Sequence, residues 1–287
     1  MKVLSLFDGM SCGRIALDRA GINVTSYHAS ELDKYAIKVT QANWPETVQL
    51  GDVTKWREWD IDWNIDLLIG GSPCQGFSFA GKQLAFDDPR SKLFFVYVDI
   101  LNHIKTLNPN VKFMLENVRM KKEYLDIISE QLGVDPVFIN SALVSAQNRQ
   151  RFYWANWKIE QPEDKGIIWR SIKEENAPAC HYYSQKGLDW IKRHSERTGK
   201  KLRVWADNEK CQMLEATMYK NYSGQRFFAI DDVNGKRYIS LLECERAQTV
   251  PDNYTNHVSN SQRYKMLGNG WTVDVIAHIF KQGLKND

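Results

Sequence analysis

The chain has 287 residues, 43% of them hydrophobic, and a formal net charge of +3. This length allows one large core and a smaller lobe, and the weak charge means that a polyanion would have to be bound by a local basic patch. The five cysteines fit neither a disulfide framework nor a set of zinc ligands. No segment has the charged-then-apolar pattern of a signal peptide, and no apolar run is long enough to span a bilayer. We therefore expect a soluble protein of a reducing compartment.

The first half of the chain predicts strands that alternate with helices. Buried strands are expected at 3–7, 24–29, 47–50, 65–69 and 111–115, and helices at 13–20, 33–42 and 93–107. Repeated strand–helix–strand units predict a parallel sheet with helices on both faces.

The second half predicts a separate lobe. After Trp154 the periodicity is lost, and residues 156–237 are polar and basic with scattered aromatic residues. Helical spacing returns at Ser261 and ends at 273–280. We expect a first domain at 1–155, a small lobe at 156–257, and a segment at 258–287 that packs back onto the first domain.

Three acidic residues, Asp8, Glu31 and Asp52, follow three successive predicted strands. Asp8 would repel a pyrophosphate at the first turn, which also has fewer glycines than a dinucleotide site needs. Glu31 stands where ribose hydroxyls are commonly bound, and Asp52 is placed to take an adenine amino group. Each acid alone could equally cap a turn, but together they favour a nucleoside pocket that suits S-adenosylmethionine better than NAD.

A candidate nucleophile, Cys74, follows the buried run 65–69 in a turn rich in glycine and proline. The carboxyl ends of parallel strands are where open α/β sheets bind ligands. Glu116 ends another predicted strand, and Arg149 and Arg151, two residues apart, would share one face of an extended segment. A surface carboxylate and a solvated charged strand are the alternatives for these residues.

These residues lie in strings that resemble, in order, the motifs of the carbon-5 cytosine DNA methyltransferases over nearly the whole chain. The strings are Phe7-Asp8-Gly9-x-Ser11-x-Gly13, Gly71-Ser72-Pro73-Cys74-Gln75, Glu116-Asn117-Val118, Gln147-x-Arg149-x-Arg151 and Gly268-Asn269-Gly270. The string from Glu243 to Pro251 is similar to the family's structural motif for the second lobe. The segment 77–83 looks like bacterial restriction-modification enzymes, whereas 145–154 and 270–273 look like the animal de novo enzymes.

The resemblance implies an α/β fold, with a Rossmann-like S-adenosylmethionine-dependent methyltransferase sheet and a smaller target-recognition lobe. It implies that Cys74 adds to carbon 6 of a cytosine flipped out of the DNA stack, and that Glu116 acts at ring nitrogen 3. Arg149 and Arg151 would hold the cytosine carbonyl and neighbouring groups. The methyl donor would be S-adenosylmethionine, and no metal is required.

The resemblance and the strand-end positions together give two further sets of site residues. The expected cofactor contacts are Phe7, Asp8, Gly9, Met10, Gly13, Glu31, Asp52, Val53, Leu93, Asn269 and Trp271. The expected DNA contacts are Gln75, Ser78, Lys82, Arg90, Lys200, Lys201 and Arg203. The segment 76–91 is expected to be a mobile lid. A basic cluster from Lys192 to Arg203, flanked by Trp190 and Trp205, would bind phosphates and stack on bases, unless it is a solvated face.

The expected partner is double-stranded DNA, bound by a monomer without an obligate protein partner in the cytoplasm of a bacterial or phage-infected cell. Two other functions compete with DNA methylation. One is methylation of cytosine in transfer RNA. The other is DNA binding by a regulator that has lost catalysis, which the presence of Cys74, Glu116, Arg149 and Arg151 disfavours.

Overall fold

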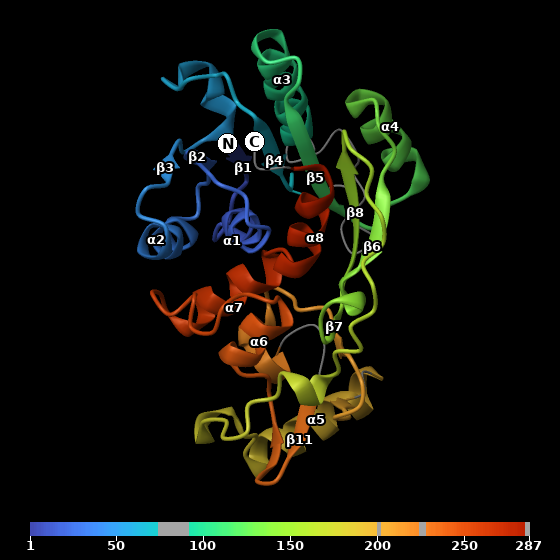
Figure 1. Cartoon of the computed structure of the whole chain (residues 1–287). Coiled ribbons are helices and arrows are strands. Elements are labelled where there is room, and N and C mark those ends of the chain that lie inside the picture. Colours follow the sequence, from blue (N-terminus) through green and yellow to red (C-terminus); the bar gives the residue numbers. More distant parts are fainter. Residues whose placement is uncertain (74–91, 200–201, 224–227, 285–287) are drawn as a thin grey trace. The chain divides into compact units, whose positions relative to one another are not determined.

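The computed structural model describes residues 1–73, 92–199, 202–223 and 228–284, which form two compact units (Figure 1). The first unit comprises Met1–Asn140, Gln150–Pro162 and Val273–Asp287, and the second comprises Ser141–Arg149 and Glu163–Thr272. No helix in the described ranges has the length and apolar character needed to cross a membrane.

A seven-stranded sheet in the order β3-β2-β1-β4-β5-β8-β6 forms the centre of the first unit. Its strands are β1 (Lys2–Leu6), β2 (Ser26–Ser30), β3 (Val48–Gln49), β4 (Leu67–Gly70), β5 (Lys112–Val118), β6 (Val137–Asn140) and β8 (Gln150–Ala155). The strands from β3 to β5 are parallel, which confirms the predicted parallel sheet over this part. Because β2 and β4 flank β1 on opposite sides, the strand order reverses there, and ligands of open α/β sheets bind at such a point.

Strand β8 departs from the predicted parallel arrangement, and β6 joins the sheet only through β8. β8 is antiparallel to both β5 and β6. Two antiparallel strands need no helical crossover between them, so the strand–helix alternation of the sequence does not reveal them.

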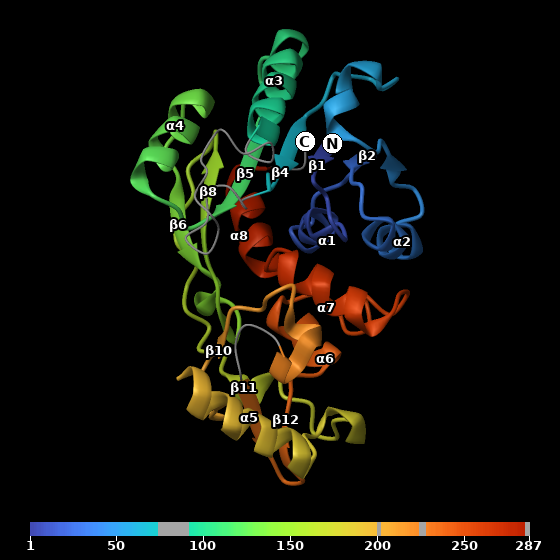
Figure 2. The same ribbon diagram turned by 180° about the vertical axis from the view of Figure 1, so that it is seen from behind.

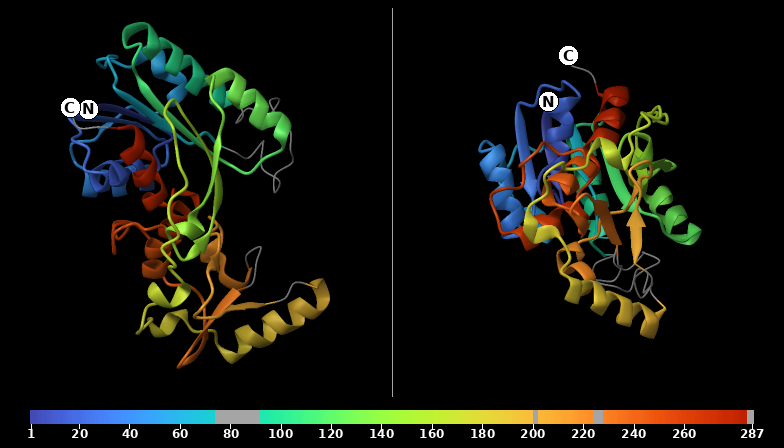
Figure 3. Two further views of the ribbon diagram at one scale, coloured as in Figure 1. Left: turned by 45° about the vertical axis from the view of Figure 1, so that its right-hand side comes forward. Right: turned by 90° about the horizontal axis from the view of Figure 1, so that it is seen from below.

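Helices cover the sheet on both sides (Figure 3). They are α1 (Cys12–Arg19), α2 (Lys34–Asn43), α3 (Lys92–Leu107), α4 (Lys122–Leu132), α8 (Val273–Gly283) and the 3₁₀ helix η1 (Val53–Glu58). α1 and α8 pack together, and Arg19 forms an ion pair with Asp274 between them.

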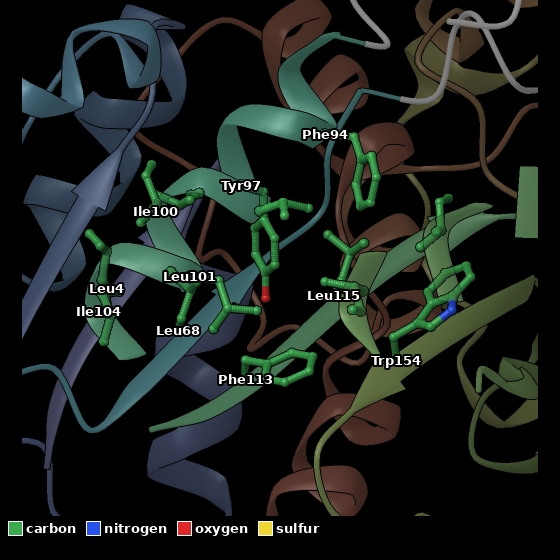
Figure 4. Close-up of a cluster of buried hydrophobic side chains, with 14 of the residues drawn as sticks. Leu4, Leu68, Phe94, Tyr97, Ile100, Leu101, Ile104, Phe113, Leu115 and Trp154 are labelled. Carbon is green, nitrogen blue, oxygen red and sulfur yellow. The ribbon is translucent and has the colours of Figure 1, made fainter. Parts of the chain in front are cut away.

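The main core lies between the sheet and the helices η1, α3 and α4. Figure 4 shows part of it, with Leu4, Leu68, Phe113, Leu115 and Trp154 from the strands and Phe94, Tyr97, Ile100, Leu101 and Ile104 from α3. The hydroxyl of Tyr97 donates to the carbonyl oxygen of Met114 at 3.1 Å, which satisfies this buried polar group. This core holds the carboxyl ends of β1, β4 and β5 in fixed register.

The second unit combines short strands and helices (Figure 2). Its strands are β7 (Gln147–Asn148), β9 (Arg203–Trp205), β10 (Cys211–Gln212), β11 (Phe228–Asp232) and β12 (Gly235–Arg237). Its helices are α5 (Gln185–Thr198), α6 (Leu241–Ala247), α7 (Asn260–Asn269), and the 3₁₀ helices η3 (Ser141–Leu143), η4 (Trp169–Ser171), η5 (Ala179–His181) and η6 (Met218–Ser223). Arg237, fully buried, pairs with Asp232 and Glu243 at 2.6 Å each and joins β12 to α6.

The unit boundaries differ from the predicted 155/156 and 257/258. Residues 156–162 stay with the first unit because the side chain of Asn156 bonds to the backbone of Val111 and Phe113, beside β5. Residues 258–272 belong to the second unit because Arg263, on α7, pairs with the buried Glu245 of α6 at 3.1 Å. The return to the first unit therefore begins at Val273, as α8.

Candidate active site

The turn after β1 has left-handed backbone torsions at Phe7 (φ 58°), Gly9 (φ 61°) and Ser11 (φ 60°). Glycine adopts this conformation at little cost, but it is rare for a side chain as large as phenylalanine. Strained backbone of this kind persists where surrounding contacts enforce it, and it clusters at ligand sites. The turn lies at the end of β1, where the strand order reverses, so it is a candidate ligand site.

The carboxylate of Glu31, just after β2, holds this turn in place. Its Oε2 accepts a hydrogen bond from the Gly9 amide at 2.8 Å, and its Oε1 accepts from the amides of Leu32 and Asp33 at 2.7 and 2.8 Å. Each carboxylate oxygen can accept two hydrogen bonds. Glu31 therefore shapes the turn and retains capacity for the predicted ribose hydroxyls.

Asp8, inside the same turn, accepts hydrogen bonds on both carboxylate oxygens. The Tyr27 hydroxyl donates to Oδ1 at 2.7 Å, and the Ser11 hydroxyl donates to Oδ2. Burial raises the pKa of Asp8 to about 6, although these hydrogen bonds act in the opposite direction. The acid predicted to face a cationic ligand is thus already bound by hydroxyls of the protein.

The other predicted cofactor residues of the first unit are divided between surface and core. Asp52 caps η1, because its Oδ1 accepts from the amide and hydroxyl of Thr54 at 2.9 and 2.8 Å, and this bonding lowers the pKa of Asp52. The buried members of the set are Met10, Gly13 and Val53. Leu93 is half-buried and packs against the core. The side chains of Met10, Val53 and Leu93 pack in or against the core, and contact of these residues and of Gly13 with a cofactor stays a prediction.

Strands β5 and β8 bring Glu116 and Arg151 into contact. Nε of Arg151 lies 2.8 Å from Oε1 of Glu116, and both residues are 8% exposed. An ion pair at this depth is screened far less by salt than a surface pair. Two of the four predicted catalytic residues therefore form one charged unit.

Asn117, the next residue on β5, bonds to the turn that leads to Cys74. Its Nδ2 lies 3.2 Å from Oγ and 3.4 Å from the carbonyl oxygen of Ser72. Sequence reasoning gave Asn117 no role, although it lies in the motif string with Glu116. Cys74, the predicted contacts Gln75, Ser78, Lys82 and Arg90, and the predicted lid lie outside the described residues.

Arg149 belongs to the second unit, where it is buried and donates to three backbone carbonyls. The acceptors are Gly270 at 2.8 Å and Gly268 and Leu214 at 3.3 Å each. The predicted common face with Arg151 is wrong, because β7 ends at Asn148 and β8 begins at Gln150. Arg149 lies between strands of different sheets, and the alternation of side chains is interrupted there.

Two fully buried glutamines, which sequence reasoning did not single out as site residues, extend this network. Nε2 of Gln147 donates to Oε1 of Gln248 at 2.8 Å and to the Ala247 carbonyl at 2.7 Å. Oε1 of Gln147 accepts from the Leu214 amide at 3.2 Å. Both glutamines lie in the motif strings, which was the available signal for finding them.

Gln248 also holds the segment that carries the predicted cofactor residues Asn269 and Trp271. Its Nε2 donates to the carbonyls of Leu267 and Gly270 at 2.6 and 3.1 Å. Asn269 is exposed and Trp271 is half-buried. The segment is therefore anchored by side chains on its inner side while Asn269 remains accessible.

The predicted DNA contacts of the second unit are only partly described. Arg203 is exposed on β9, whereas Lys200 and Lys201 lie outside the described residues. The predicted stacking role of Trp205 is wrong, because this residue is 1% exposed and packs against Trp169 with ring centroids 5.0 Å apart.

A family model and curated sequences match this chain. The model for C-5 cytosine-specific DNA methylase matches residues 1–155 and 139–285. Type II methyltransferase M1.ScrFI of Lactococcus lactis subsp. cremoris is 31% identical over 99% of this chain and 78% of its own. Type II methyltransferase M.HhaI of Haemophilus parahaemolyticus is 28% identical over 97% of this chain and 93% of its own.

Solved structures share the fold. A putative DNA modification methyltransferase of an Escherichia coli prophage superposes with a TM-score of 0.71 at 18% identity, covering 98% of both chains. The DNMT2 mutant of Spodoptera frugiperda superposes with a TM-score of 0.70 at 20% identity, again over 98% of both chains. At these identities the likeness shows the fold alone.

Proposed function

The chain belongs to the C-5 cytosine-specific DNA methylase family and methylates cytosine at carbon 5, and on this basis we propose which of its residues carry out the reaction. Cys74 is the nucleophile, Glu116 and Arg151 act on the cytosine ring, and S-adenosylmethionine is the methyl donor. The substrate is a cytosine flipped out of double-stranded DNA, because the reacting face is inaccessible in a stacked duplex.

The ion pair between Glu116 and Arg151 is the observation that carries this proposal. It lies on β5, the strand next to β4, and β4 leads through Ser72 and Pro73 to Cys74. Asn117 fastens Ser72 to β5 one residue after Glu116. Ser72, two residues before Cys74 in the sequence, is thus anchored to the strand that carries Glu116.

The reaction balances with these groups. When the base binds, Glu116 takes up a proton from water while its Oε1 stays on Arg151. The Cys74 thiolate forms a bond to carbon 6 while Glu116 gives this proton to ring nitrogen 3, so that carbon 5 becomes an enamine carbon. Arg151 orients Glu116 and stabilises the charge that develops on the ring. Carbon 5 would then take the methyl group of S-adenosylmethionine, which would leave as S-adenosylhomocysteine. A water molecule takes the proton of carbon 5, the 5,6 double bond re-forms, and the Cys74 sulfur departs with the electron pair of its bond to carbon 6. The proton on nitrogen 3 returns to Glu116.

The turn after β1 fits the proposed donor. S-adenosylmethionine supplies an electrophilic methyl group on a cationic sulfonium. The turn and its neighbouring strand ends offer the carboxylates of Asp8, Glu31 and Asp52, which favour a cation and disfavour a phosphate. Asn269, which is exposed, and Trp271, which is half-buried, are also proposed to contact the donor.

Arg149 is proposed to act through the segment 268–270 as a positioning residue. Its guanidinium donates to the backbone oxygens of Gly268 and Gly270, which flank Asn269. A buried arginine with several carbonyl acceptors fixes backbone more firmly than a lysine, because its donors are arranged in a rigid fork.

The described cysteines are weaker candidates for the nucleophile than Cys74. Burial raises the pKa of the Cys211 and Cys244 thiols, so neither forms a thiolate readily at neutral pH. Cys12 is buried as well. Cys180 is exposed, and it provides a matched control.

We also propose that the protein acts as a monomer on double-stranded DNA, without an obligate protein partner, in a bacterial or phage-infected cell. Its curated relatives come from bacteria and from Bacillus phages, and several are type II methyltransferases. A role in a restriction-modification system agrees with those relatives.

A duplex containing 5-fluorocytosine tests the proposal. Fluorine cannot leave carbon 5 as the proton does, so methyl transfer should trap the protein as a covalent adduct that survives denaturing electrophoresis. Cys74→Ser should abolish the adduct, whereas Cys180→Ser should leave it intact. A wild-type protein that methylates DNA but gives no adduct, or an adduct that survives in Cys74→Ser, would reject Cys74 as the nucleophile.

A further inference from the structure

Helix α5 of the second unit presents a basic and aromatic stripe along its exposed side. Lys186, Trp190, Arg193 and Arg197 are spaced by four, three and four residues, so they line up on one side of the helix. The three charged residues are exposed and Trp190 is half-buried. Gly187 and Ile191, which lie outside the stripe on another side of the helix, are buried.

The cations of this stripe have no acidic partner among the described residues. In the part of the chain that the structure describes, Lys186, Arg193 and Arg197 form no ion pair with an acid. Seven other arginines among the described residues do pair with acids: Arg14, Arg19, Arg57, Arg151, Arg237, Arg246 and Arg263. Asp189 on the same helix accepts a hydrogen bond from Gln185 at 2.9 Å. The stripe therefore offers positive charge to an external anion.

The aromatic side of the stripe is ordered. The rings of Trp190 and His194 stack with centroids 4.7 Å apart and an interplanar angle of 15°. Nδ1 of His194 lies 3.1 Å from a guanidinium nitrogen of Arg197. Trp190 and Arg197 both contact His194, so their side chains are restrained before a ligand binds. This restraint lowers the entropy cost of contact with a ligand.

The spacing of the charges fits a polyanion with a regular repeat. Lys186 and Arg197 are eleven residues apart, which is ~16 Å along an α-helix. Phosphates recur every ~3.4 Å of axis along one strand of duplex DNA, so the stripe covers about five of them. Arg203, on β9, is exposed as well. The three-stranded sheet that contains β9 lies beside α5 (Figure 2, Figure 3).

From these observations we propose that the stripe Lys186–Trp190–Arg193–Arg197 binds the phosphate backbone of duplex DNA and supplies affinity that does not depend on base sequence. The proposal rests on DNA being the substrate, as argued above. Contacts to phosphates position a protein on the duplex but do not read its sequence. The stripe therefore differs in role from the residues that choose the target cytosine.

The double variant Arg193→Gln/Arg197→Gln tests this proposal against a matched control, Lys38→Gln/Lys122→Gln. Both doubles lower the net charge equally. Lys38 is exposed on α2 and Lys122 is exposed on α4, and neither lies in the second unit. The affinity for a labelled duplex is measured by fluorescence anisotropy from 50 to 200 mM salt, together with methyl transfer at saturating DNA.

Each lost phosphate contact should reduce the slope of log affinity against log salt by about 0.9. The affinity ratio of wild type to the arginine double should therefore shrink about tenfold between 50 and 200 mM salt. The loss should be equal for duplexes with and without the methylation site, and methyl transfer at saturating DNA should be retained. The lysine double should keep the wild-type slope.

Three outcomes would overturn the proposal. They are a wild-type slope in the arginine double, an equal change in both doubles, and a loss confined to duplexes that carry the methylation site. Circular dichroism checks that α5 remains folded, and Arg193→Gln alone, with half the slope change, is the fallback variant. Failure of the wild-type protein to methylate any duplex would instead reject the proposed function.

Discussion

Asp8→Asn should raise the free energy of unfolding at pH 8 and change it much less at pH 4.5. Burial raises the pKa of Asp8 from its ordinary 3.8 to about 6. Below pH 3.8 the carboxyl is protonated in both the folded and the unfolded protein, so burial of a charge costs nothing. Between pH 3.8 and 6 the unfolded state loses the proton first, and stability falls as the pH rises. Above pH 6 the cost stays at its full value, ~3 kcal/mol for this difference in pKa.

Urea unfolding of wild type and variant without cofactor, from pH 4.5 to pH 8, measures this cost. Asparagine has one acceptor oxygen for the hydroxyls of Tyr27 and Ser11, so the variant also loses about one hydrogen bond, ~1 kcal/mol at every pH. The informative quantity is therefore the change in the stability difference with pH, which should be ~2 kcal/mol in favour of the variant over this range. Asp52→Asn is the control, because the lowered pKa of Asp52 leaves it ionised throughout. A constant difference between wild type and Asp8→Asn would refute the raised pKa.

Three further variants test the site. Glu116→Gln should slow methyl transfer by about 100-fold with nearly unchanged S-adenosylmethionine binding by calorimetry, and loss of that binding would assign Glu116 a structural role instead. Arg149→Lys should raise the KM for S-adenosylmethionine by about tenfold, the effect of one charged hydrogen bond, with a smaller effect on kcat. A fall in kcat alone would point to contact with the base. Gly268→Ala should destabilise the protein by ~1–3 kcal/mol, because its Cβ would lie 2.3 Å from the backbone of Glu215 and Ala216. An unchanged thermal midpoint would contradict that close approach.

The elements that sequence reasoning found have strong local signals. The predicted strand at 3–7 corresponds to β1 and the predicted helix at 33–42 to α2, within one or two residues. β1 is buried along most of its length, so its residues form an apolar run. α2 begins at an Asp33 side chain that accepts from the Tyr35 amide, a local capping signal.

The elements that sequence reasoning missed lack a clear periodic pattern of apolar residues. α5 lies in a region predicted to have no strong period, although Ser184 caps its start and Gly199 ends it with φ 70°. Only Gly187 and Ile191 of its described residues are buried, so its apolar stripe is too narrow to stand out. The strand β6 has an exposed Phe138 at the edge of the sheet and follows a proline, so its pattern does not alternate clearly.

Most of the predicted site residues have interaction partners that lie far away in the sequence. Sequence reasoning could therefore identify these residues but could not predict their contacts. Glu116 and Arg151 meet because β5 and β8 pair, and Gln147 reaches Gln248 across 101 positions. Motif strings mark such residues without saying what they touch. The residue spacing that joined Arg149 to Arg151 holds within one strand, and it fails here because two strands meet between them. One arginine therefore serves the acid on β5, and the other serves the backbone beside Asn269.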